Sequence, residues 1–480
     1  MRLDDFYERL WKKKATVIGI GVSNTPLIKF LKQHGAEVTA RDIKPRENFG
    51  ALADELERDG VKLRLGEDYL EGLDEEFIFR SPGIRPDIPE FEAARARGAV
   101  VTSEIEMFLE LCPCKVFAVT GSDGKTTTTT LAGMLLKTES EKRARGGTFK
   151  VLVGGNIGRP LLPEIDNLSA DDYVVAELSS FQLQSLTEVS PYGAAVTNVT
   201  PNHLNWHKDM DEYTRAKENI FLHPGCGRLV LNYGCDATRE MAPLVDMPVS
   251  WFSAKTMPEQ RRQDDVLYYL ENGFIMRRAG ETVKEVLDIS KIKVPGIHNV
   301  ENFMTAIALT WGFVSNRTIY DVARKFKGVE HRCELVRLVG GVKYYNSSID
   351  SSPTRTEACL RSFKEKVIVI CGGYDKHIPY EPLAKPLIDC AKVVVLVGAT
   401  SPKIKEALLA DPDYDGSPEI IEIEGLDDAA FVRAVRTAGE RAEPGDSVVL
   451  SPASASFDMF KNFMTRGNRF KEIVRCLEDE

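Results

Sequence analysis

The stretch that decides the fold is Val119-Thr120-Gly121-Ser122-Asp123-Gly124-Lys125-Thr126-Thr127. A run of residues with β propensity, 115–120, precedes this stretch and breaks at Gly121. Glycines in such a turn let backbone N–H groups approach a polyphosphate, while Lys125 adds a positive charge and the Thr126 hydroxyl suits a magnesium ion. The pattern therefore predicts a phosphate-binding loop between a strand and a helix, with ATP as its ligand.

The loop departs from the standard P-loop spacing. GxxxxGK[ST] would place a glycine at position 119, where the chain has Val119. We therefore expect a short variant of the loop. On these residues alone, a glycine-rich turn that carries a surface lysine and binds nothing remains the alternative.

Strands and helices alternate along the rest of the chain. Because 480 residues exceed what one hydrophobic core organises, we expect three α/β domains, at residues 1–112, 113–330 and 331–480. The first and third are expected to be Rossmann-like, and the second to be a parallel sheet of the P-loop ATPase type. Residues 137–149 are strongly polar, and a solvated insertion is expected there.

Composition narrows the classes of function. The net charge of −10 disfavours nucleic acid as a partner, because such binding draws on basic side chains. Nine cysteines without a CxxC pair predict reduced thiols and a cytoplasmic location. No apolar stretch approaches the ~20 residues that a membrane span needs, so none is expected.

Two turns in the first domain follow predicted strands. In Gly19-Ile20-Gly21-Val22-Ser23-Asn24, Asn24 replaces the third glycine of the dinucleotide fingerprint, so a nicotinamide cofactor is poorly supported. Ser81-Pro82-Gly83 follows residues 76–80 at the strand end where open α/β sheets bind ligands. A nucleotide-like ligand is the expectation, and a plain Pro-Gly turn is the alternative for the second segment.

The central domain offers metal ligands beside the phosphate loop. Glu177 ends the apolar strand 173–176, and His203 follows the next strand along the chain. Because the carboxyl ends of parallel strands meet at one edge of a sheet, we expect both side chains near the loop, with Glu177 as a magnesium ligand. Lys217 lies on a predicted helix, where by itself it would be taken as a solvated lysine.

Seven motifs together resemble the Mur ligase family, and the resemblance extends over essentially the whole chain. They are GSDGKTTT (121–128), GGNIGRP (154–160), ELSSFQL (177–183), TNVTPNHL (197–204), YTRAKENI (213–220), HNVENFMTAIA (298–308) and SPASASFDMFKNFMTRGNRF (451–470). The last motif is the most specific to the branch of the family that adds D-glutamate.

The resemblance implies an ATP-dependent acid–D-amino-acid ligase of peptidoglycan precursor synthesis. The γ-phosphoryl group of ATP would move to the carboxylate of UDP-N-acetylmuramoyl-L-alanine, and the amine of D-glutamate would then attack the acyl phosphate. The three domains would bind the UDP substrate, ATP and the amino acid in chain order. The expected partners are these substrates, and the chain is expected to be a monomer.

The resemblance also assigns roles to individual residues. The positions around ATP are Gly121, Ser122, Asp123, Gly124, Lys125, Thr126, Thr127, Asn302 and Arg332. The positions around two magnesium ions are Thr126, Glu177, His203 and Lys217. Lys217 corresponds to a lysine that the family carries N6-carboxylated, which turns a cationic amine into an anionic ligand. The expected catalytic residues are Lys125, Lys217 and His203.

Further positions correspond to the family's substrate contacts. Those for the UDP substrate are Val22, Ser23, Asp42, Ser81, Pro82, Gly83, Asn156 and His203. Those for D-glutamate are Ser351, Lys376, Ser456, Phe457 and Phe463. One departure affects the nucleotide: Asn346-Ser347-Ser348 stands where the family has Asn-Asp-Ser. Asp350 is our candidate to replace the missing aspartate.

Three other interpretations remain open at this point. A sibling ligase for another amino acid or dipeptide, or a folylpolyglutamate enzyme, would share the central domain but should lack the motif at 451–470. An ATP-binding regulatory protein would keep the fold without turnover, and Ser347 is the one feature in its favour. A phosphotransferase would release ADP without an amino-acid acceptor.

Overall fold

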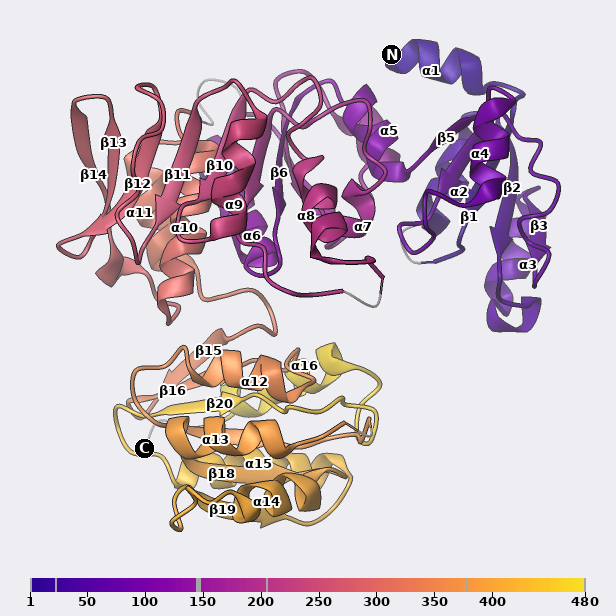
Figure 1. The fold of residues 1–480 in the computed structure, drawn as a ribbon. Helices are drawn as coiled ribbons and strands as arrows, with labels where there is room; N and C mark the ends of the chain where they lie inside the picture. Colours follow the sequence, from indigo (N-terminus) through magenta and orange to yellow (C-terminus); the bar gives the residue numbers. More distant parts are fainter. Residues whose placement is uncertain (1, 22–23, 144–147, 204–205, 377, 479–480) are drawn as a thin grey trace. The chain divides into compact units, whose positions relative to one another are not determined.

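Three separate sheets organise the computed structural model of this chain (Figure 1). The structure describes residues 2–21, 24–143, 148–203, 206–376 and 378–478. The chain divides into two compact units, which are residues 1–289 with 301–322 (unit 1) and residues 290–300 with 323–480 (unit 2). Unit 1 contains the first two sheets, and unit 2 contains the third.

The first sheet is parallel throughout, in the order β3-β2-β1-β4-β5. Its strands are β1 (Lys14–Ile18), β2 (Glu37–Asp42), β3 (Lys62–Leu65), β4 (Phe77–Arg80) and β5 (Val100–Thr102). The helices of this part of the chain are α1 (Leu3–Leu10), α2 (Asn24–Gln33), α3 (Ala51–Arg58), α4 (Pro89–Ala96) and α5 (Glu104–Leu111). The strand order reverses between β1 and β4, and ligands bind open α/β sheets at the carboxyl end of such a switch point.

The second sheet has nine strands, in the order β14-β13-β12-β11-β10-β9-β6-β8-β7. They are β6 (Lys115–Thr120), β7 (Val151–Gly155), β8 (Tyr173–Glu177), β9 (Gly193–Val196), β10 (Arg228–Asn232), β11 (Val249–Ser253), β12 (Val266–Glu271), β13 (Phe274–Ala279) and β14 (Thr282–Asp288). The strands from β7 to β12 are parallel, and β13 and β14 extend the sheet antiparallel. The phosphate loop follows β6, which is buried from Val116 onward between β8 and β9.

The α-helices described alongside this sheet are α6 (Lys125–Lys142), α7 (Ser180–Leu183), α8 (Met210–Glu218), α9 (Asp236–Met241), α10 (Ile297–Thr310) and α11 (Asn316–Lys325). Of these, α6 packs on β6, β7 and β8 and begins directly after the phosphate loop. The edge at which the parallel strands end is therefore the edge that carries the phosphate loop, residues 121–127.

The prediction of a solvated insertion at residues 137–149 is wrong for its first half. Helix α6 continues to Lys142, and Glu139 is buried within it. Its Oε2 atom accepts hydrogen bonds from the Ser315 backbone N–H at 2.9 Å and from the Thr318 hydroxyl at 2.6 Å. A buried carboxylate that is hydrogen-bonded in this way packs without an unsatisfied charge. Residues 144–147 of the same segment lie outside the described residues.

The third sheet has six strands, in the order β15-β16-β20-β17-β18-β19, and only the β15–β16 pair is antiparallel. The strands are β15 (Glu334–Val339), β16 (Val342–Asn346), β17 (Val367–Cys371), β18 (Ala391–Val397), β19 (Glu419–Ile423) and β20 (Ser447–Leu450). The helices are α12 (Pro353–Leu360), α13 (Glu381–Cys390), α14 (Ser401–Ala410), α15 (Asp428–Glu440) and α16 (Phe463–Arg475).

Three α/β sheets in chain order confirm the predicted fold class. The domain boundaries after residues 112 and 330 stay predictions. Within the described part of the chain, no helix combines the length and the apolar character that crossing a membrane would require.

Candidate active site

The phosphate loop depends on two glycines for its shape. Gly121 has φ +146° and Gly124 has φ +77°, both in the region that favours glycine. A Cβ atom on Gly121 would lie 1.9 Å from Thr197 Oγ1, and one on Gly124 would lie 2.5 Å from Asn302 Oδ1. The backbone is therefore packed too closely for side chains at these two positions.

The carboxyl end of β9 holds the loop from one side. Thr197 Oγ1 donates to the Asp123 carbonyl at 2.5 Å, and the Asp123 N–H donates to Asn198 Oδ1 at 2.9 Å. The Ser122 hydroxyl donates to the Thr200 carbonyl at 2.9 Å and lies 3.0 Å from the Tyr213 hydroxyl. Two sequence motifs, at 197–204 and 213–220, contain Thr197, Asn198 and Tyr213. The sequence alone does not reveal that these residues form hydrogen bonds with the loop.

The first turn of α6 is available to an anion. Gly124 is the N-cap residue and provides no side-chain cap, so the first N–H groups of the helix are not satisfied by such a bond. Lys125 folds back over the loop, and its Nζ donates to the carbonyls of Gly121 at 2.9 Å and Ser122 at 2.8 Å. Thr126 and Thr127 follow in the first turn. This is the arrangement of dipole and charge that binds phosphates.

Glu177, the last residue of β8, is 2% exposed. Its Oε1 atom accepts a hydrogen bond from Asn156 Nδ2 at 2.9 Å. Its Oε2 atom is buried and has no hydrogen-bond partner in the described part of the chain. An unsatisfied buried carboxylate oxygen costs free energy, so Oε2 fits a ligand position for a cation such as magnesium.

The environment of Lys217 differs from that of the solvated lysine that its position alone would suggest. It lies on α8 but is only 1% exposed, and its Nζ donates to the Gly121 carbonyl at 2.8 Å. Lys125 donates to the same carbonyl, so two amines meet at one oxygen. Burial, together with the charge of Lys125, places the pKa of Lys217 well below its usual value. The neutral amine, the form that reacts with carbon dioxide, is therefore favoured.

His203 lies close enough to Lys125 and Lys217 to be affected by their charges. Its ring centroid is 4.9 Å from that of Phe181 and 6.5 Å from that of Tyr213. Desolvation and the charges of Lys125 and Lys217 lower the pKa of His203, which favours the neutral imidazole that binds metals. The described residues hold no group of three or more His, Cys, Asp or Glu side chains that could bind a metal, so a magnesium site here would need other donors.

In the first sheet, the described residues that are predicted for the UDP substrate lie at the carboxyl ends of β2 and β4. Asp42 Oδ2 accepts from the Ile20 N–H at 2.7 Å, and Asp42 Oδ1 accepts from the Lys44 N–H at 2.9 Å. The Ser81 N–H donates to the Ile18 carbonyl at 2.9 Å, which brings Ser81, Pro82 and Gly83 to this edge. Val22 and Ser23 lie outside the described residues.

Asn302 contacts the phosphate loop. Its Oδ1 atom accepts from the Thr128 hydroxyl at 3.2 Å, and its side chain is buried against Gly124. This contact joins α10 to the first turn of α6.

In unit 2, the predicted amino-acid residues have different exposures. Lys376 and Phe457 are exposed, Ser351 and Phe463 are half-buried, and Ser456 is buried. The Phe457 ring packs edge-on against Tyr374 at 5.8 Å between centroids. The Phe463 ring lies 5.9 Å from that of His331, next to Arg332.

Arg466 is a residue of this region that sequence reasoning missed. It is 1% exposed, and its guanidinium donates to the Ser348 hydroxyl and to the carbonyls of Ser348, Ser454 and Ala455 at 2.9–3.0 Å. These bonds tie α16 to the segment after β16 and to the loop that carries Ser456. The motif at 451–470 contains Arg466 and could have drawn attention to it. The motif does not reveal that the side chain is buried.

Ser347 and Asp350 both lie inside unit 2. Ser347 Oγ accepts from the Cys333 N–H at 3.0 Å and so holds the backbone next to Arg332. Asp350 is 6% exposed and accepts from the Ser451 hydroxyl at 2.8 Å. Burial raises the pKa of Asp350 to about 6. This position gives no support to a direct contact between Asp350 and the nucleotide.

A strand–loop–helix phosphate site on a parallel sheet, followed by a separate α/β unit, defines a P-loop protein of the ATP-using class. Comparison with family models narrows this class. The Mur ligase MurD-like N-terminal domain matches residues 13–103, the Mur ligase middle domain matches 119–310, and the Mur ligase glutamate ligase domain matches 331–454. The chain belongs to the Mur ligase family, among the UDP-N-acetylmuramoylalanine–D-glutamate ligases.

Individual relatives align with this chain over nearly its full length. A UDP-N-acetylmuramoylalanine–D-glutamate ligase of Acetivibrio thermocellus is 48% identical over 481 aligned residues, 99% of each chain. One of Ruminiclostridium cellulolyticum is 46% identical, again over 99% of each. Among solved structures, UDP-N-acetylmuramate-alanine ligase of Thermotoga maritima has a TM-score of 0.54 at 19% identity and covers 96% of this chain, with 99% of its own chain covered. That likeness shows the fold alone.

Proposed function

We propose that this protein is the ATP-dependent ligase that adds D-glutamate to UDP-N-acetylmuramoyl-L-alanine in peptidoglycan precursor synthesis. The curated relatives that match 99% of the chain carry this name. The structural observation that carries the proposal is a buried amine and an unpartnered carboxylate oxygen beside the phosphate loop. Lys217 Nζ and Glu177 Oε2 supply these two groups.

The first step would transfer the γ-phosphoryl group of ATP to the substrate carboxylate. The N–H groups at the start of α6 and the Lys125 ammonium would bind the phosphates and reduce the repulsion between two anions. Asn302 would keep α10 against this helix turn through Thr128. The enzyme's main contribution to this step is to hold charges in place.

Two magnesium ions are part of the proposal. Thr126, Glu177, His203 and an N6-carboxylated Lys217 would hold them, and the unpartnered Glu177 Oε2 supports this set. Bound magnesium would supply charge neutralisation across the phosphates. Carboxylation of Lys217 forms an N–C bond between the neutral amine and carbon dioxide and releases one proton. The product is an anion, which relieves the repulsion from Lys125.

In the second step the D-glutamate amine attacks the acyl carbon, phosphate leaves, and the nitrogen gives up a proton. The family resemblance supports Ser351, Lys376, Ser456, Phe457 and Phe463 as the residues that bind D-glutamate, with the Lys376 ammonium suited to a carboxylate. Asp42, Ser81–Gly83 and Asn156 are proposed for the UDP substrate. The role of Arg332 toward ATP remains a prediction.

Phosphate release tests this function against the alternatives. Purified protein with ATP, magnesium and UDP-N-acetylmuramoyl-L-alanine is assayed with D-glutamate, L-glutamate, L-alanine or no amino acid. We expect release that requires D-glutamate. Release with L-alanine would assign a sibling ligase. Formation of ADP without an amino-acid acceptor and without release of phosphate would assign a phosphotransferase. ATP binding without any turnover would favour the regulatory interpretation.

A further inference from the structure

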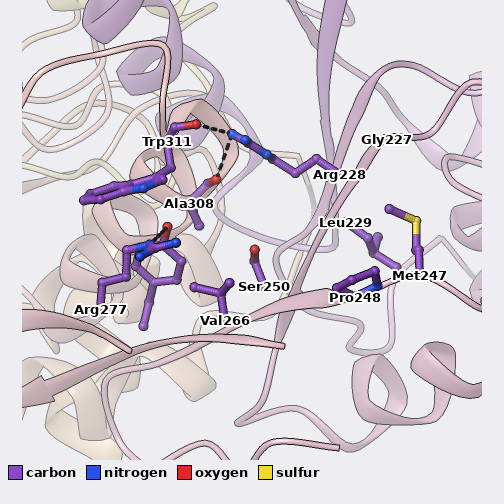
Figure 2. Close-up of a pocket in the computed structure, with 11 residues that line it drawn as sticks. Gly227, Arg228, Leu229, Met247, Pro248, Ser250, Val266, Arg277, Ala308 and Trp311 are labelled. Carbon is purple, nitrogen blue, oxygen red and sulfur yellow. Dashed lines mark hydrogen bonds between the residues drawn. The ribbon is translucent and has the colours of Figure 1, made fainter. Parts of the chain in front are cut away.

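A cavity lies in unit 1, at the end of the nine-stranded sheet that is opposite the phosphate loop. It has a volume of about 180 Å³ and is lined by the first residues of β10, β11 and β12, by β13, and by the end of α10 (Figure 2). Strands β9 to β12 run parallel to β6, whose carboxyl end leads into the phosphate loop. The amino ends of these strands are therefore away from the reaction site.

Arg228, the first residue of β10, forms one wall of this cavity. Its Nη1 atom donates to the carbonyls of Leu309 at 2.9 Å and Trp311 at 2.7 Å, which lie near and beyond the end of α10. A weaker bond to the Ala308 carbonyl is 3.5 Å long, and Figure 2 draws it together with the bond to Trp311. These bonds satisfy carbonyls that a helix end leaves open. Within the described part of the chain, Arg228 has no carboxylate at salt-bridge distance.

Arg277 of β13 forms the facing wall. Its guanidinium carbon lies 4.6 Å from the ring centroid of Trp311, and its Nε donates weakly to the Tyr268 hydroxyl at 3.3 Å. Figure 2 shows the guanidinium beside the Trp311 ring. Its two terminal nitrogens have no hydrogen-bond partner among the described residues, and no carboxylate pairs with it there.

The cavity thus carries positive charge without compensation. None of its lining residues is acidic. Burial lowers the pKa of Arg228, and the like charge of Arg277 acts in the same direction. Two cations that share a partly desolvated cavity favour the binding of an anion.

We propose that this cavity binds a small organic carboxylate. The carboxylate would lie between Arg228 and Arg277, and the apolar part would contact Leu229, Met247 and Val266, which also line the cavity. The volume equals that of about six water molecules in the liquid, so a ligand of amino-acid size is the upper limit. The apolar wall is the reason to prefer an organic acid over an inorganic anion.

The test measures binding, so its outcome does not depend on ligase turnover. Sodium butyrate is titrated into the full-length protein by calorimetry and by thermal unfolding, with sodium chloride at matched ionic strength. The neutral isostere butyramide is titrated in parallel, and inorganic phosphate forms a further arm. We expect saturable binding of butyrate, an increase in Tm, and no saturable effect of butyramide.

Arg277→Met is the informative variant, because methionine keeps the apolar stem on Trp311, whereas substitution of Arg228 removes the cap of α10. We expect butyrate binding to weaken about tenfold or more in Arg277→Met, through loss of charged hydrogen bonds. Arg278→Met is the matched control, since neighbouring strand residues point to opposite faces, and it should bind like the wild type. The proposal is overturned if butyrate does not bind, if butyramide binds equally, if phosphate alone binds, or if Arg277→Met changes nothing.

Discussion

At the scale of single residues, Lys217 and Glu177 account for most of the chemistry that we propose. A lysine that is 1% exposed and a carboxylate oxygen without a partner are both costly in a folded protein. They lie close to Gly121 and to Asn156 respectively, on elements that meet at the phosphate loop. Carboxylation of Lys217 and a cation bound beside Glu177 would remove both costs.

Lys217→Met is predicted to lower kcat by about 100-fold or more, because it removes the anionic ligand that carboxylation provides while keeping a buried stem of similar length. In ¹³C NMR with labelled bicarbonate, the wild type should show a carbamate signal that the variant lacks. Lys137→Met, which changes an exposed lysine on α6, is the control. A carbamate signal that persists in Lys217→Met would refute the assignment.

Glu177→Gln is predicted to fold normally, because the amide can keep the bond to Asn156 and no longer buries an unpaired charge. Activity should fall by about 100-fold, and the magnesium concentration needed for half-maximal rate should rise. Steady-state rates across a magnesium series measure both effects, with Glu188→Gln on the surface as the control. Unchanged magnesium dependence would remove Glu177 from the metal site.

At the scale of elements, sequence patterns predicted the strands well and the buried polar residues poorly. The strand at 115–120 has the predicted bounds, and those predicted at 173–176 and 76–80 differ from β8 and β4 by one residue at one end, because apolar runs end at turn residues. The local pattern alone would place Glu139 and Lys217 in solvent, because their partners Thr318 and Gly121 are 179 and 96 positions away in the chain. Burial of a charged side chain depends on such distant partners, and a local pattern does not contain them.

Gly121→Ala tests the turn between β6 and α6. The added Cβ would collide with Thr197, and φ +146° disfavours any side chain. We expect a loss of about 2 kcal/mol or more in the free energy of unfolding and weaker ATP binding. Gly273→Ala, at φ +81° with open space around it, should cost less and leave ATP affinity unchanged. Equal effects of the two variants in urea unfolding would argue against a tight loop.

Asp350→Asn tests the segment after β16 through its pH dependence. Burial raises the pKa of Asp350 to about 6, so the folded protein favours the protonated acid. That stabilisation is present below pH 4 and is lost as the pH rises through 6. Compared with the variant, the wild type should lose on the order of 3 kcal/mol between pH 4 and pH 7. Asp415→Asn, at an exposed site, should leave the pH profile as it is; a profile in Asp350→Asn equal to the wild type would contradict the burial.

At the scale of the whole molecule, the residues of the phosphate loop and the proposed metal site lie in a different unit from those that we propose for D-glutamate recognition. The phosphate loop, Glu177 and Lys217 belong to unit 1, whereas Lys376 and Ser456 belong to unit 2. Arg332, which is predicted to contact ATP, also belongs to unit 2. The motifs predicted the fold class and the family, because each motif marks a strand end or a helix start. Arg466 and the Arg228–Arg277 cavity were not foreseen, since each depends on contacts between elements.

The most direct test of the proposed ligase follows oxygen atoms. UDP-N-acetylmuramoyl-L-alanine with ¹⁸O in its terminal carboxylate is turned over with ATP and D-glutamate, and the released phosphate is analysed by mass spectrometry. An acyl phosphate requires that one carboxylate oxygen leaves with the phosphate, so we expect one ¹⁸O in each phosphate and one D-glutamate added to the product. Unlabelled phosphate, with no amide formed, would contradict the assignment of this site to ligase chemistry.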